Sequence, residues 1–269
     1  MAANANKGLE SFQNDLTVSL IATGRAKLTT CRADEELTTV LDQSRQTNFD
    51  FYPVTEPAAE IGPRAPILGL IELAGFKSIN VPNGLVGEYM QPLSDHNLIG
   101  ADASILDFIR CSELQRCRLV VSGSEISGLV SLSDLQRLPV RAALFAMVTH
   151  LEMTMTSWIR SNSGDWLQKL STERQEKVRS KVKEAKLADA YVDSLLFTEF
   201  GDKVTIIKRS QNFCWAKASF KDDLAQVQSL RNSLAHASDY ACTPAQERQV
   251  CKTVNLIDSW ICRLGESKS

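Results

Sequence analysis

The sequence predicts an α+β protein in which two strand–helix–strand–strand–helix units precede an all-helical segment. An internal repeat in the first half, helical spacing of apolar residues in the second, and Leu138-Pro139 between them support this prediction. Proline restricts the residue before it and suits the first turn of a helix, so a helix is expected to begin there. We therefore expect a polar N-terminal segment over residues 1–15, a repeat domain over 16–138 and an α-helical domain over 139–269.

The internal repeat consists of aligned segments in two copies, over about residues 16–78 and 84–138. Ala33-Asp34-Glu35-Glu36-Leu37 aligns with Ala101-Asp102-Ala103-Ser104-Ile105, and Ile67-Leu68-Gly69-Leu70-Ile71 aligns with Ile126-Ser127-Gly128-Leu129-Val130. The offset shortens between these pairs because the proline-rich loop Glu56–Pro66 occurs in the first copy. Repeats of this kind indicate architecture more strongly than single motifs do. The first copy is expected to contain strands at Ala26–Cys31, Phe49–Val54 and Ile67–Ile71, and a helix at Glu35–Gln43.

The second copy ends in a motif, Gly128-Leu129-Val130-Ser131-Leu132-Ser133-Asp134-Leu135, that resembles the closing motif of a CBS (cystathionine β-synthase) domain. The resemblance covers about residues 16–138 and implies a tandem pair that binds a regulatory adenine nucleotide, ATP, ADP or AMP. It implies that Ser131 and Asp134 contact the ribose, and Gly128 belongs to the same candidate site. A carboxylate can accept hydrogen bonds from ribose hydroxyls, and a strand-to-helix turn presents backbone N–H groups to anions.

The first copy departs from this motif, because Glu72 and Gly75 stand where the hydroxyl and the carboxylate are expected. At most one nucleotide site per chain is therefore predicted, in the second copy. The structural alternative for the second copy is a capping box, with Ser131 as N-cap and Asp134 three residues later. Three arginines could bind phosphates or could equally be solvated at the surface: Arg116, Arg118 and Arg137.

Apolar residues recur at helical spacing throughout the second half. The expected helices are Val140–Ile159, Ala188–Phe200, Phe200–Arg209, one carrying Phe220 to Leu234, and Thr243–Leu264. The fourth of these ends in Arg231-Asn232-Ser233-Leu234-Ala235-His236. Histidine can take and return a proton near neutral pH, and arginine can stabilise charge on phosphate oxygens. Asn232 and His236 share a helix face, whereas Arg231 must reach across with its long stem unless the helix loosens near Ser238.

The Arg-Asn-x-x-x-His run on a late helix resembles the HEPN (higher eukaryotes and prokaryotes nucleotide-binding) superfamily, over about residues 139–264. The resemblance implies a metal-independent endoribonuclease of the toxin–antitoxin or anti-phage kind, with a composite site in a homodimer. Its implied roles are general acid or base for His236, phosphate clamp for Arg231 and imidazole orientation for Asn232. Glu152, on the first helix of the domain, is a candidate partner of this site. The alternatives are an inactive HEPN-like domain, a structural helix with a polar face, and an exposed or salt-bridged Glu152.

Charge is unevenly distributed along a chain whose net charge is −2. Residues 1–138 carry 11 basic and 17 acidic side chains, and residues 139–269 carry 19 and 15. An anionic partner is therefore expected for the second half, and Lys169–Lys186 could follow an RNA backbone or form a solvated helix. The seven cysteines form no C-x-x-C pair, so no metal site is predicted. No apolar run is long enough to span a membrane and no signal peptide is seen, so a cytoplasmic protein without a membrane or DNA partner is expected.

Together these patterns predict a cytoplasmic homodimeric endoribonuclease that needs no cofactor for catalysis and is regulated by an adenine nucleotide. RNA is its expected substrate, and an antitoxin protein is a candidate partner. The alternative is a non-catalytic nucleotide sensor whose helical domain serves dimerisation or partner docking. A regulatory subunit of another enzyme would differ from that sensor only in its partner.

Overall fold

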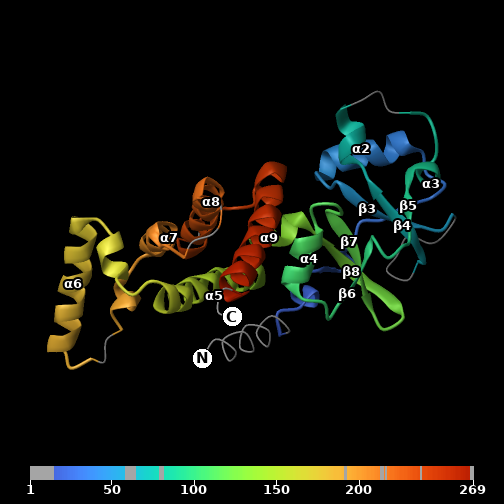
Figure 1. Cartoon of the computed structure of the whole chain (residues 1–269). Coiled ribbons are helices and arrows are strands. Elements are labelled where there is room, and N and C mark those ends of the chain that lie inside the picture. Colours follow the sequence, from blue (N-terminus) through green and yellow to red (C-terminus); the bar gives the residue numbers. More distant parts are fainter. Residues whose placement is uncertain are drawn as a thin grey trace. The chain divides into compact units, whose positions relative to one another are not determined.

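A computed structural model describes residues 15–57, 65–78, 82–190, 193–212, 215, 217–236 and 238–266. The described residues up to Val140 form one compact unit, and those from Arg141 onward form another (Figure 1). The expected polar segment 1–15 lies outside this part of the chain except for Asp15. Within the described ranges, no helix combines the length and the apolar character needed to cross a membrane.

The first unit is built on two four-stranded sheets (Figure 1). In each sheet a parallel pair of strands is followed by antiparallel neighbours. One sheet has the order β2-β3-β4-β5, formed by Cys31–Arg32, Phe51–Thr55, Ile67–Glu72 and Gln91–Pro92. The other has the order β1-β8-β7-β6, formed by Thr23–Gly24, Glu125–Ser131, Cys117–Ser122 and Leu98–Gly100. The repeat and the α+β class expected from the sequence are therefore present.

The two repeats exchange their leading strands. Strand β1, near the start of the first repeat, pairs with β8 of the second, and β5, near the start of the second repeat, pairs with β4 of the first. Each exchanged strand passes close to a glycine. A Cβ on Gly69 would lie 2.2 Å from the carbonyl oxygen of Gln91, and a Cβ on Gly128 would lie 2.6 Å from that of Thr23. Only glycine permits these close approaches of two backbones.

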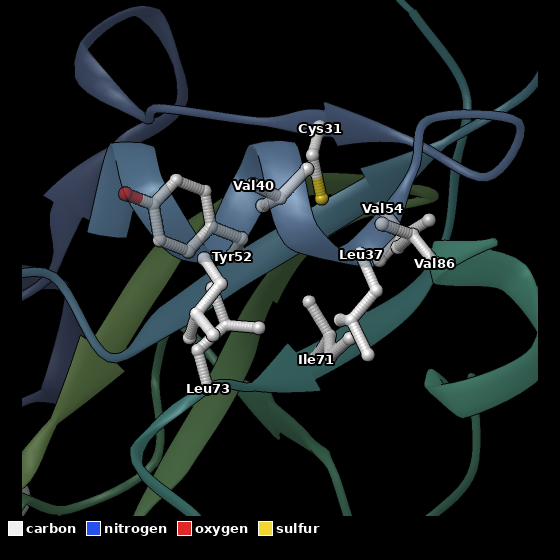
Figure 2. Packing of buried hydrophobic residues seen from close by; sticks show 9 residues of the cluster. Cys31, Leu37, Val40, Tyr52, Val54, Ile71, Leu73 and Val86 are labelled. Carbon is white, nitrogen blue, oxygen red and sulfur yellow. The ribbon is translucent and has the colours of Figure 1, made fainter. Parts of the chain in front are cut away.

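The core of the first repeat lies between its sheet and the helices α2 (Leu37–Thr47) and α3 (Val86–Tyr89). Figure 2 shows apolar side chains from these elements packed together, with Tyr52 at one side of the group. The hydroxyl of Tyr52 lies 2.8 Å from Oγ1 of Thr47, so its polar end has a partner although the residue is fully buried. Burial also raises the pKa of Cys31, another member of this core, to about 12.

The second repeat has the corresponding helix α4 (Ile105–Cys111), and the hydroxyl of Ser104 caps it by accepting from the N–H of Leu106 at 3.2 Å. The two sheets are joined by an apolar cluster to which both repeats contribute: Ile67, Leu70, Cys117 and Leu119, with Phe51, Leu98, Ile126 and Leu129 packed against it. The pair of repeats therefore shares one core between its sheets.

Two expectations for the repeats were wrong in detail. The segment Ala26–Cys31 was expected to be a strand, but the chain forms a 3-10 helix, η2, at Arg25–Lys27 and only the short strand β2. Each repeat was expected to end in an α-helix, but each ends in a 3-10 helix, η3 at Ala74–Ser78 and η4 at Leu132–Gln136. A further 3-10 helix, η1, occupies Val18–Leu20. The closing segments of about five residues are too short for α-helices to gain much from propagation.

The second unit is helical in the residues that the structure describes. Its elements are α5 (Leu138–Asn162, which begins in the first unit), η5 (Trp166–Lys169), α6 (Thr172–Leu187), η6 (Ser194–Phe197), α7 (Phe200–Arg209), α8 (Lys217–Ala235) and α9 (Pro244–Glu266). The expected helix Ala188–Phe200 was wrong, because its described residues before Phe200 contain only the short η6. Asp189 has a positive φ of 54°, a backbone conformation that no continuous α-helix contains.

The core of the second unit is formed by the apolar faces that the sequence predicted on α5, α8 and α9. Leu144, Leu151 and Met155 of α5 are fully buried. Trp260 of α9 packs edge-on against Phe220 of α8, with ring centroids 4.7 Å apart. Its indole N–H donates to Oδ2 of Asp223 at 3.1 Å, so this large buried side chain fixes α8 against α9.

Candidate functional site

The turn after β8 places the two residues that the CBS-like motif singles out. Ser131 ends the strand and Asp134 lies in η4, and both are almost completely buried. Oδ2 of Asp134 accepts hydrogen bonds from the backbone N–H of Ser131 at 2.9 Å and from its hydroxyl at 3.4 Å. The two residues form a capping box, the structural alternative considered from the sequence. The capping role and a ligand-binding role involve the same carboxylate.

Asp134 is held in a mixed environment. Burial raises the pKa of its carboxyl above the ordinary value, although the bonds from Ser131 and the guanidinium of Arg137 act in the opposite direction. Nε of Arg137 donates to Oδ1 at 2.8 Å. A carboxylate offers about four lone-pair positions, and three are used here, so Oδ1 keeps room for one further donor.

The corresponding turn of the first repeat has different chemistry. Glu72, at the end of β4, is half-buried and pairs with Arg116 at 3.3 Å between Oε1 and a terminal guanidinium nitrogen. Gly75 lies in η3, so no side chain stands where Asp134 stands in the second repeat. The two turns that the sequence distinguished therefore also differ in structure.

Gly128 lies three residues before this turn, where β1 pairs with β8. A Cβ at this position would collide with the carbonyl oxygen of Thr23, which explains why a glycine is needed there. The equivalent Gly69 has the same role against β5 in a repeat without the motif. The close approach of β1 therefore explains the presence of a glycine at position 128 without any ligand.

The three arginines near the second repeat differ in what they contact. Arg137 binds Asp134, and Arg116 pairs with Glu72 and also stacks over Phe51 with its Cζ 5.8 Å from the ring centroid. Arg118, on β7, forms no ion pair with a residue in the described ranges, and its buried Nε has no hydrogen-bond partner among them. Of the three arginines, Arg118 is therefore the one whose charge is not balanced by an ion pair with a described residue.

In the second unit, the Arg-Asn-x-x-x-His run occupies the C-terminal end of α8. The helix ends at Ala235, and the N–H of His236 still donates to the carbonyl of Asn232 at 3.0 Å. The N–H of Ser238 then donates to the carbonyl of Ser233 at 3.0 Å, which closes the helix with a wider turn. His236 and Asn232 are exposed and Arg231 is half-buried.

Arg141 of α5 holds this helix end, a role that no pattern in the sequence indicated. Its guanidinium donates to the carbonyls of Ser233 at 3.1 Å, Leu234 at 3.3 Å and Ser238 at 3.0 Å. It also stacks over the ring of Tyr240, 4.9 Å from the centroid. A cation at a helix C-terminus satisfies carbonyls that have no partner in the helix, so Arg141 fixes the segment that carries His236.

Glu152, the candidate partner on the first helix of the domain, lies beside Arg231. Its Oε2 lies 3.5 Å from Nε of Arg231, and its Oε1 accepts from Nζ of Lys203 at 2.9 Å. Lys203 is only 4% exposed and also donates to the carbonyl of Thr198 at 2.9 Å. Sequence reasoning missed Lys203, because a lysine on an amphipathic helix ordinarily points to solvent.

These contacts bring together two of the four residues predicted for the catalytic site. Arg231 and Glu152 form an ion pair, and the salt-bridged alternative for Glu152 describes the same contact. The side chains of Asn232 and His236 form no hydrogen bond or ion pair with any residue in the described ranges. Arg231 uses Nε in its ion pair, and its two terminal nitrogens have no partner among the described residues. No group of three potential metal-binding side chains occurs in that part of the chain either.

No protein-family model and no curated protein matches the chain. Solved structures similar to it include the CBS domain of a bacterial CNNM/CorC family Mg²⁺ transporter in complex with ATP (15% identity, 50% of this chain, 91% of that chain, TM-score 0.38). The CBS domains of a transcriptional regulator from Streptococcus pneumoniae are 16% identical and match 44% of this chain and 95% of that chain, with a TM-score of 0.35. CBSX2 in complex with AMP is 18% identical and matches 48% and 96%, with a TM-score of 0.35.

Proposed function

We propose that the first unit is a regulatory sensor that binds one adenine nucleotide per chain at the turn after β8. The observation that carries this proposal is the difference between the two repeats. The second repeat places the carboxylate of Asp134 beside the hydroxyl of Ser131, whereas the first has Glu72 and Gly75 at these positions. A ribose hydroxyl would donate to the free lone-pair position on Asp134, and Arg118, which forms no ion pair with a described residue, offers a cation for phosphate.

The test is calorimetric titration of the purified chain with ATP, ADP and AMP. We expect one site per chain, and we expect Asp134→Ala to weaken binding at least about tenfold because the ribose loses its acceptor. Glu72→Ala is the matched control and should bind like the wild type. Two equal sites per chain, or unchanged binding in a folded Asp134→Ala protein, would reject the proposal.

A second candidate function concerns the helical unit, and a specific contact favours it. Glu152 holds Arg231 through Nε and leaves its terminal nitrogens free, next to a helix end that exposes His236. We propose that this end of α8 belongs to a metal-independent endoribonuclease of the HEPN-like kind, with RNA as substrate. The sensor would then regulate an enzyme instead of acting as a non-catalytic docking protein.

The proposed reaction is attack of an RNA 2′-hydroxyl on its neighbouring phosphate. His236 takes the proton of the 2′-hydroxyl, the new O–P bond forms, and the bond to the 5′-oxygen breaks, giving a 2′,3′-cyclic phosphate and a 5′-hydroxyl. Arg231 stabilises the charge on the phosphate oxygens. One imidazole cannot both accept the first proton and donate to the leaving oxygen in the same step. His236 of a second copy would supply that proton, in agreement with the expected homodimer.

Cleavage of total RNA in EDTA tests this candidate. Wild type should yield 2′,3′-cyclic phosphate ends, and His236→Ala should lose at least about a hundredfold in rate, as expected for removal of a general acid or base. His96→Ala, which removes another exposed histidine, is the matched control. Equal cleavage by wild type and His236→Ala would remove His236 from the proposed role. A wild type that binds nucleotide but cleaves no RNA would favour the non-catalytic sensor.

The remaining partners follow from the two resemblances. An antitoxin protein is the proposed inhibitor if the helical unit is a toxin, and the cytoplasm is the proposed location of both. Growth arrest on expression that is relieved by Arg231→Ala would support the toxin assignment, and unaltered growth would count against it. Light scattering of the purified chain would test the homodimer.

A further inference from the structure

Helix α6 forms one wall of an apolar groove in the second unit, separate from the end of α8. The cavity has a volume of about 500 Å³. Its apolar lining includes Trp166 and Leu167 of η5 and Val178 and Val182 of α6. Leu187, which ends α6 and also lines the groove, is 80% exposed. A groove lined by apolar side chains and open to solvent is an unfavourable surface unless a partner covers it.

The groove is elongated along α6. Its lining residues on this helix run from Val178 to Leu187, and nine residues of an α-helix rise about 14 Å. Val178 and Val182 are one turn apart and therefore form a stripe along one face. A groove of this length accommodates about two and a half turns of a second helix, whose apolar anchors recur at i, i+3, i+4 and i+7.

Uncompensated positive charge follows the same stripe. Arg179, Lys183 and Lys186 line the groove, and none of them forms an ion pair with a residue that the structure describes. Arg179 only donates to the side-chain oxygen of Gln175 at 3.4 Å. The three cations repeat at four- and three-residue steps, so they form one edge of the groove.

Two other basic residues of α6 have acidic partners inside the unit, whereas Lys181, outside the groove, forms no ion pair with a described residue. Arg174 donates to both carboxylate oxygens of Asp202, at 2.9 and 2.5 Å, and to Glu199 at 3.1 Å. Lys177 also pairs with Glu199, at 3.4 Å. The face of α6 toward α7 is therefore neutralised inside the unit, and the face along the groove is left positive.

We propose that this groove is a docking site for an amphipathic helix of a partner protein. The helix would place aliphatic or aromatic side chains between η5 and α6 and acidic side chains beside Arg179, Lys183 and Lys186. Charge complementarity favours an acidic partner, and the apolar lining favours aliphatic or aromatic anchor residues on its helix. RNA fits less well, because single strands bind through successive bases stacked on several aromatic side chains, and Trp166 is the one aromatic side chain among the described residues that line the groove.

A synthetic helix can test the chemistry before any natural partner is known. The probe is a fluorescein-labelled peptide of about 18 residues, with Leu at the i, i+3, i+4 and i+7 positions and Glu elsewhere. Fluorescence anisotropy with the full-length chain should show saturable binding. The double variant Lys183→Glu/Lys186→Glu should weaken it at least about tenfold, and so should Val182→Asp. With 5-fluorotryptophan incorporated, the ¹⁹F resonance of Trp166 should shift most among the four tryptophans.

Matched controls distinguish this site from general charge attraction. Lys181→Glu alters the same helix outside the groove and should change the affinity less than about twofold. A peptide with Lys in place of Glu should not bind. The proposal is overturned if the Glu peptide does not bind, if Lys181→Glu and the double variant weaken it equally, or if Trp166 does not respond. A labelled single-stranded RNA of about 20 nucleotides is the last comparison. If the double variant loses binding to this RNA but not to the Glu peptide, the surface binds nucleic acid and the proposal is overturned.

Discussion

The two repeats of the first unit have the same strand order but different chemistry at the turn that closes each sheet. In both, a parallel strand pair, a hairpin and an exchanged edge strand build the sheet. The second repeat then turns through Ser131 and Asp134, which bind each other, whereas the first turns through Glu72 and Gly75. The glycines that admit the exchanged strands occur in both repeats.

This difference separates two kinds of residue. Gly69 and Gly128 are required by the pairing of the repeats, so the same residue type appears at both positions. The carboxylate at Asp134 has no counterpart in the first repeat, although the backbone there has a similar course. A feature that both repeats share is therefore explained by architecture, and a feature that only one repeat has is the better candidate for binding.

The largest expected effect concerns the shared feature. Gly69→Ala and Gly128→Ala place a methyl group 2.2 and 2.6 Å from a carbonyl oxygen of the exchanged strand, so the strand must move. We expect losses in unfolding free energy of about 3 and about 2 kcal/mol, measured by urea denaturation. Gly75→Ala, whose Cβ would have no atom within 4 Å, is the control and should differ little from wild type. A stable Gly69→Ala protein would mean that β5 does not pair as described.

The second prediction compares the turn carboxylates. Asp134→Ala leaves the buried N–H of Ser131 and the guanidinium of Arg137 without their acceptor. We expect a loss of about 1–2 kcal/mol in unfolding free energy, in the range for a lost cap. Glu72→Ala removes a half-exposed ion pair and should cost less than about 1 kcal/mol. Equal losses would contradict the structural distinction between the turns, whatever the ligand.

The repeat architecture was predictable because the aligned segments can be recognised in the sequence without knowledge of any contact. The helices α5, α7 and α9 were predictable for the same reason. The exchange of β1 and β5 was not, because two-residue strands have no periodicity and their partners lie in the other repeat. Helical spacing also misled the prediction over Ala188–Phe200, where Asp189 turns the backbone to positive φ.

The candidate sites were predictable as motifs but not as contacts. The position of Asp134 in a capping box followed from Ser131 three residues earlier, and the Arg-Asn-x-x-x-His run was visible in sequence. Arg141 and Lys203 were not visible, because they act on α8 and Glu152 from helices far away in the chain. Such contacts depend on helix packing, which the spacing of apolar residues does not specify.

A smaller effect is expected in the pH dependence of stability, and it applies only to the second repeat. Burial raises the native pKa of Asp134 above 3.8, so the protonated carboxyl is favoured in the folded state. Its contribution to stability is therefore present below pH 3.8 and is lost as the pH rises through the native pKa. The unfolding free energy of wild type minus that of Asp134→Asn should therefore decrease as the pH rises. Urea titrations between about pH 3.5 and about pH 7 measure this difference. A difference that grows with pH would show a carboxylate stabilised by Arg137 instead of one penalised by burial.

The smallest expected effect concerns two ion pairs at corresponding places before β3 and β7. Asp50 pairs with Lys77 of its own repeat at 2.7 Å, whereas Arg116 pairs with Glu72 of the other repeat at 3.3 Å. All four side chains are between 22 and 39% exposed, so each coupling energy from a double-mutant cycle should be about 0.5 kcal/mol and should decrease in high salt. Arg116→Ala should nevertheless cost more than Lys77→Ala, because it also removes the stacking over Phe51. Equal costs for the two variants would show that this stacking adds nothing to the contact between the repeats.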